Sequence, residues 1–150
     1  MDIDEAEYLF ESEDFYLFDD ELRSQLTRAF QYVSCEDAKS ILDSALFVCC
    51  GNGEGSWHLP PSLIRNRSVV ILDPENMRIP DSATITILHE AAHSVLGHSP
   101  FGQTKSRDEY QRQEDEAWSK VREWLPERFH DEIERCESEG GGSTGSLHPQ

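Results

Sequence analysis

Apolar residues recur at intervals of three or four in the first half of the chain, which predicts two amphipathic helices. The first follows the capping candidates at 19–20, and its apolar positions are Leu22, Leu26, Ala29, Phe30 and Val33. The second follows Ser34, and its apolar positions are Ala38, Ile41, Leu42, Ala45 and Leu46. Serine and aspartate before an apolar periodic segment are typical helix N-caps.

The pattern then changes from helical to extended. Residues 68–72 read Ser-Val-Val-Ile-Leu and are followed by Asp73-Pro74, a run of β-branched residues that ends at a turn signal. This is the clearest strand prediction in the chain. A weaker candidate is the segment Ser56–Leu59, which precedes two prolines.

Helical patterns return in the second half. A proline at the first helical position and a glycine just past the end predict one helix from Pro80 to about Gly97. A second helix begins at 106–109 and runs to about Leu125, and residues 129–136 predict a further short helix.

Composition bounds the class of protein. The chain has 150 residues, which is enough length for one domain. Its formal net charge of −17 repels nucleic-acid phosphates. We therefore expect no direct nucleic-acid binding. No apolar run is long enough for a bilayer, and residues 1–5 do not resemble a secretory signal. Because Cys35, Cys49, Cys50 and Cys136 form no disulfide or CxxC pattern, we expect reduced thiols and a cytoplasmic location.

The two ends differ from the middle. Residues 1–19 are strongly acidic and carry interleaved aromatic residues, which predicts a partly disordered arm. A second interpretation is that this arm docks on a partner or covers a cleft of the domain. Residues 137–150 are rich in glycine and serine and predict a flexible tail, so the folded domain is expected at 20–136.

The predicted helix from Pro80 carries the sequence His89-Glu90-Ala91-Ala92-His93. Two histidines four apart lie on one face of a helix, so both imidazoles can reach one metal ion. The intervening glutamate can accept a proton from a metal-activated water. The simpler alternative is a helix with two ordinary histidines.

A catalytic zinc needs a third protein ligand. The metzincin extension requires glycine and histidine at the positions that Leu96 and Ser99 occupy, so that class is excluded. His98 would project to another side of a continued helix, and we interpret it as a polar residue near the helix end. Cys50 would be the ligand in a deformylase-like site, but the glycine-rich segments of that class are missing.

The best third candidate lies on the following helix. At 100° per residue, Glu114 falls within an apolar stripe made of Tyr110, Ala117, Trp118, Val121, Trp124 and Leu125. A carboxylate there is costly unless a metal or a cationic side chain compensates it, so Glu114 is either a ligand or a paired interior acid. Glu116 falls on the polar side, together with Gln113, Lys120 and Glu123.

These features resemble the ImmA/IrrE-type metallopeptidase domain. The similarity covers roughly residues 56–126: a strand at 68–72, the histidine helix, and the segment Glu114-Asp115-Glu116-Ala117, which is similar to the family's Glu-x-Glu-Ala. Trp118, which follows, departs from the small polar residue usual in that family. The resemblance implies an α+β fold, a minimal zincin-like domain with a small sheet packed on the HExxH helix and a following ligand-bearing helix. It also implies a protein or peptide substrate, with transcriptional repressors as the family's typical targets.

The expected mechanism follows from these roles. Zinc held by His89, His93 and Glu114 would activate a water, and Glu90 would act as the general base. Tyr110 and His58 are candidates for stabilising the transition state. The alternative function is a non-catalytic zinc-binding module that docks a regulatory partner.

Overall fold

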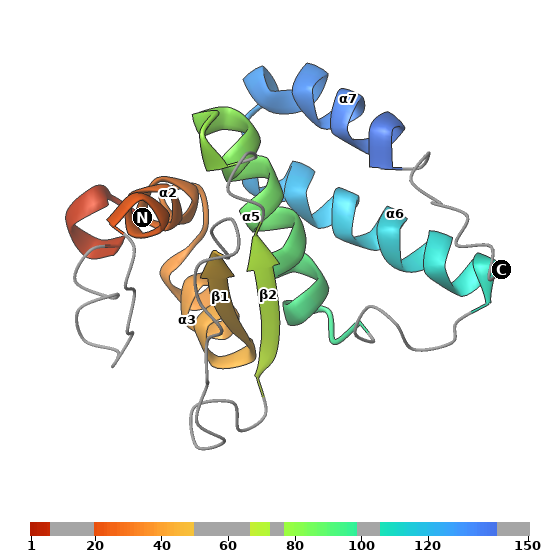
Figure 1. The fold of residues 1–150 in the computed structure, drawn as a ribbon, viewed down its shortest axis with the longest axis horizontal. Helices are drawn as coiled ribbons and strands as arrows, with labels where there is room; N and C mark the ends of the chain where they lie inside the picture. The colour runs from red at the N-terminus through yellow and green to blue at the C-terminus, as the bar shows by residue number, and fades with distance from the viewer. Residues whose placement is uncertain (7–19, 50–66, 73–76, 99–105, 141–150) are drawn as a thin grey trace, which may run out of the picture.

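The computed structural model describes residues 1–6, 20–49, 67–72, 77–98 and 106–140. In this part of the chain the fold is mostly helical, with one small parallel sheet, which agrees with the α+β class (Figure 1). The elements are α2 (Asp20–Phe30), α3 (Cys35–Ser44), β1 (Ala45–Cys49), β2 (Ser68–Leu72), α5 (Pro80–Val95), α6 (Arg107–Trp124), η1 (Glu127–Phe129) and α7 (His130–Gly140).

Local sequence signals set most helix boundaries. The Ser34 hydroxyl accepts a hydrogen bond from the Asp37 amide at 3.0 Å, and Ser106 caps α6 in the same way through the Glu109 amide. Each cap satisfies a backbone donor that the first helical turn leaves free. α5 begins at Pro80, the first helical position, where a backbone N–H would have no partner within the helix. These starts confirm the sequence prediction.

The second predicted helix was too long. α3 ends at Ser44, and residues 45–49 form β1, which pairs in parallel with β2 from Ala45 opposite Ser68 to Cys49 opposite Leu72. Ala45 and Leu46 happen to continue the helical spacing of α3, but they belong to an apolar run, ALFVC, that forms the strand. β2 has the bounds predicted for it, whereas the candidate strand at 56–59 lies outside the described residues.

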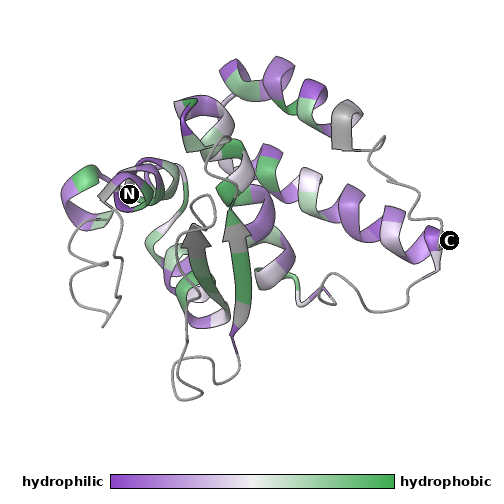
Figure 2. Cartoon of the chain, viewed as in Figure 1, coloured by the Kyte–Doolittle hydropathy of each residue, from purple (hydrophilic) through white to green (hydrophobic). Residues whose placement is uncertain are grey.

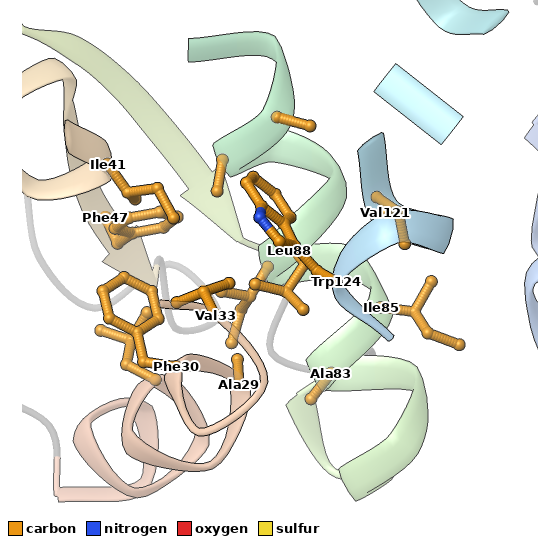
Figure 3. Close-up of a cluster of buried hydrophobic side chains, with 14 of the residues drawn as sticks. Ala29, Phe30, Val33, Ile41, Phe47, Ala83, Ile85, Leu88, Val121 and Trp124 are labelled. Atoms are coloured by element: carbon orange, nitrogen blue, oxygen red, sulfur yellow. The ribbon is translucent and has the colours of Figure 1, made fainter. Parts of the chain in front are cut away.

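Helix α5 is the centre of the fold. It packs against α6 on one side and against α2, α3 and β2 on the other, as Figure 1 shows. The core between these elements is drawn in Figure 3, where Phe30, Phe47 and Leu88 contribute from α2, β1 and α5. A fully buried side chain of this size contributes about 1.5–3 kcal/mol to folding. This burial holds α5 against α2 and the sheet.

The surface is polar on the outer helices. Figure 2 shows hydrophilic residues along much of α6 and α7, whereas β2 is hydrophobic where it is coloured. α7 extends to Gly140, beyond the domain end predicted at Cys136. Residues 3–6 are helical and Ala6 is buried, but most of the acidic arm lies outside the described residues. Among the described helices, none is long and apolar enough to cross a membrane.

Candidate metal centre

Helix α5 presents its two motif histidines on the side that faces α6. One side of α5 is buried in the core through residues such as Ile87, Leu88 and Ala91, while His89 and His93 are only partly buried. The two imidazole rings are one helical turn apart, and their Nε2 atoms approach to 3.1 Å. The helix therefore aims both Nε2 atoms at the same point.

Helix α6 supplies the third group. Glu114 Oε2 lies 3.4 Å from His89 Nε2, and Glu114 Oε1 lies 3.3 Å from His93 Nε2. Among the described residues, these three side chains are the one group whose nitrogen, sulfur or carboxylate atoms lie close enough to hold a metal ion. The apolar stripe of α6 packs on α5 through Ala117 and Val121, both fully buried, and this packing carries Glu114 to the histidines.

The two Nε2 atoms and the Glu114 carboxylate lie close enough together to bind one metal ion. A zinc ion with bonds of about 2.0–2.1 Å to nitrogen and oxygen holds its ligand atoms about 3.3–3.4 Å apart. The two Nε2 atoms are 3.1 Å apart, His93 Nε2 lies 3.3 Å from Glu114 Oε1, and His89 Nε2 lies 3.4 Å from Glu114 Oε2. Two neutral imidazoles and one carboxylate are also a donor set that zinc accepts in catalytic sites.

The histidines determine the charge of Glu114. Burial alone would raise the pKa of this carboxyl group, but the hydrogen bonds and the coulombic attraction of His89 and His93 outweigh it. The net effect holds the pKa of Glu114 well below its usual value. Glu114 is therefore an anion at neutral pH, as a metal ligand must be.

The indole ring of Trp118 packs against His89. The indole of Trp118 lies against the imidazole, with ring centroids 4.0 Å apart and planes tilted by 33°. Trp118 is 8% exposed and comes from α6, one turn after Glu114. The Nδ1 atom of His89 is buried and has no hydrogen-bond partner among the described residues, so stacking on Trp118 adds to the Nε2 contacts in orienting this ring.

Tyr110 lies at the edge of the cluster. Burial raises the pKa of Tyr110, and the negative charges of Glu114 and Glu90 raise it further. Tyr110 is 43% exposed, so its end of the predicted apolar stripe reaches solvent. The other candidate stabiliser, His58, lies outside the described residues.

Two residues had roles that sequence reasoning missed. His98 was expected on another side of the helix, but its Nδ1 lies 2.9 Å from His93 Nδ1. Glu116 was expected to be solvated, and it is 43% exposed, yet its Oε2 lies 3.0 Å from His98 Nε2. The hydrogen bond with His98 and the charge of Arg112 lower the pKa of Glu116. Gln113, also assigned to the polar side, is buried.

The signal that would have found His98 is the glycine before it. Gly97 adopts φ +67°, and α5 ends there in a Schellman turn: the His98 amide donates to the His93 carbonyl and the Gly97 amide to the Ser94 carbonyl. This turn folds the residue after the glycine back against the last turn of the helix. A helical projection that continues past Gly97 therefore places His98 on the wrong side.

No family model matches the chain, and neither curated proteins nor solved structures gave a significant match. The resemblance to ImmA/IrrE-type peptidases therefore rests on the residues quoted for it alone.

Proposed function

We propose that this chain is a zinc-dependent metallopeptidase. The observation that supports the proposal is the convergence of His89 Nε2, His93 Nε2 and the Glu114 carboxylate: the two Nε2 atoms are 3.1 Å apart, and each lies 3.3 to 3.4 Å from one of the two Glu114 oxygens. Three protein ligands leave one position of a tetrahedral ion open, which is the arrangement of catalytic rather than structural zinc sites. When bound, zinc supplies a Lewis acid that lowers the pKa of a water toward about 7.

In the proposed reaction, different residues of the chain would bind the metal, transfer the proton and stabilise the transition state. His89, His93 and Glu114 hold the ion, and Trp118 keeps the His89 ring in place. Glu90, next to His89 on α5, accepts the proton of the attacking water and delivers it to the leaving amine. The Tyr110 hydroxyl, whose pKa is raised by burial and by the nearby charge of Glu114, would donate a hydrogen bond to the developing oxyanion.

The presence of Glu90 favours catalysis over a purely structural zinc site, because a structural site needs no base beside its ligands. The class of substrate, a protein or peptide of regulatory function, is proposed from the resemblance to ImmA/IrrE-type peptidases. Strand β2 is a candidate surface for aligning such a substrate by strand addition, since among the described residues it pairs with β1 alone.

The test is a comparison of the wild type with Glu90→Gln, which keeps the size of the side chain but removes the base. Both proteins are loaded with zinc and incubated with a diverse peptide library, and cleavage is read by mass spectrometry. We expect equal zinc content and cleavage only by the wild type. Cleavage that persists in Glu90→Gln contradicts the assigned base, and zinc binding without any cleavage supports the non-catalytic zinc module instead.

A further inference from the structure

His93 contacts a second imidazole on the side opposite the candidate metal position. Its Nε2 faces His89 and Glu114, whereas its Nδ1 lies 2.9 Å from His98 Nδ1. His98 continues to Glu116 through Nε2 at 3.0 Å, and Glu116 also accepts a hydrogen bond from Arg112 at 3.1 Å. The side chains of His93, His98 and Glu116 thus form a continuous line from the candidate metal position to the surface of α6.

The positions of the ring protons on His98 and His93 follow from the carboxylate of Glu116 at the end of this line. Glu116 is a carboxylate and can only accept, so His98 donates through its Nε2–H. A neutral His98 then has an unprotonated Nδ1, which can only accept. The hydrogen bond of 2.9 Å therefore requires a proton on His93 Nδ1. With a metal in place of the Nε2 proton that faces Glu114, His93 would be neutral, with its proton on Nδ1 and its Nε2 lone pair directed to the ion.

We propose that His98 is a positioning residue that fixes the tautomer and the ring orientation of His93, with Glu116 as its anchor. The inference rests on the proposed zinc site. Histidine ligands usually donate their second ring N–H to an outer acceptor, and here a histidine backed by a carboxylate takes that place. The His98 side chain is only 5% exposed, so water does not substitute freely for it.

The backbone provides for this contact. The Schellman turn at Gly97 closes with the hydrogen bond of 3.0 Å from the His98 amide to the His93 carbonyl, so the two residues are tied together by main chain as well as by side chain. In such turns the residues at these two positions frequently make an apolar contact. In this chain the two residues are His93 and His98, so the turn that ends α5 also holds the His98 imidazole against the candidate ligand His93.

The first test compares the zinc affinity of His98→Leu and His98→Asn with that of the wild type, by competition with a chromophoric chelator. Asn places its amide oxygen on Cγ, where histidine has Nδ1, and can still accept from His93. Leu fills the space but cannot accept. We expect His98→Leu to weaken zinc binding by about 10- to 100-fold and His98→Asn to stay close to the wild type.

A role in packing alone predicts the reverse order, because a buried site tolerates Leu better than Asn. The matched control is His130→Leu, a partly buried histidine at the start of α7, which should bind zinc as the wild type does. If His98→Leu does not fold by circular dichroism, Glu116→Ala at the surface carries the test, with a loss of about tenfold.

A second readout is the tautomer itself. The chain has only six histidines, so long-range nitrogen–proton NMR spectra of the zinc-loaded protein can assign them. We expect His93 to carry its proton on Nδ1 and His98 on Nε2. A proton on His98 Nδ1, or undiminished zinc affinity in both His98→Leu and Glu116→Ala, overturns this inference alone. A wild type that binds no zinc overturns the proposed function and this inference with it.

Discussion

The imidazole of His89 lies against the indole of Trp118, with the ring centroids 4.0 Å apart. This contact joins the first candidate ligand on α5 to the helix that carries Glu114, so the two helices hold the site from both sides. It also places a fluorescent side chain in direct contact with a group that would bind zinc.

We therefore predict that zinc changes the tryptophan emission of the wild type and that the change disappears in Trp118→Phe. Zinc binding fixes the charge and the orientation of the His89 imidazole next to the indole. A phenylalanine at position 118 keeps an aromatic contact with His89 but gives no tryptophan emission. Trp124→Phe is the control, because Trp124 donates to Asp37 at 3.0 Å and does not contact His89. A zinc response that is unchanged in Trp118→Phe would show that the ion binds elsewhere.

Zinc should also stabilise the fold. A ligand that binds only the native state contributes about 2.7 kcal/mol when its free concentration is 100 times Kd. For a domain of this length, that corresponds to a rise in Tm of roughly 5–10 °C. The shift should be visible by differential scanning fluorimetry, should reverse when a chelator is added, and should be absent in Glu114→Gln. An equal shift in Glu114→Gln would mean that other groups bind the ion.

Gly97 should be needed for the stability of the α5 terminus. Its φ of +67° lies in the left-handed region, which costs other residues about 1–2 kcal/mol. A Cβ at this position would meet nothing within 4 Å, so the cost of Gly97→Ala is conformational rather than steric. We expect that loss of unfolding free energy in urea titrations, and a smaller loss for Gly97→Asn. Equal stability of the alanine variant and the wild type would contradict the left-handed turn.

Much of the site was predictable because it lies on two strongly periodic helices. The HExxH spacing places His89 and His93 together, and the helical phase of α6 selects Glu114 over Glu116 as the residue nearest to them. Both inferences need only the repeat of an α-helix, which is favoured by the Ser106 cap, by Pro80 at the first position of α5 and by the buried faces of the two helices.

The features that the sequence analysis did not predict, strand β1 and the position of His98, both lie where a helical pattern stops. Ala45 and Leu46 fit the helical spacing of α3, yet pairing with β2 makes them part of a strand, and pairing between distant segments is not visible in local spacing. The position of His98 was predicted wrongly for the same reason, because α5 ends at Val95 and the chain turns back at Gly97. Its contact with Glu116 also requires the packing of α5 against α6.

The most direct test of the central claim is the zinc stoichiometry and affinity of the wild type beside Glu114→Gln. The glutamine keeps the shape of the side chain but removes the charge that faces His89 and His93. Asp115→Asn is the control, since Asp115 is exposed and pairs with Gln111 instead. We predict one zinc per chain for the wild type and for Asp115→Asn, and a loss of more than about 100-fold in affinity for Glu114→Gln, larger than an outer-shell change produces. Full zinc binding by Glu114→Gln would contradict the three-ligand site.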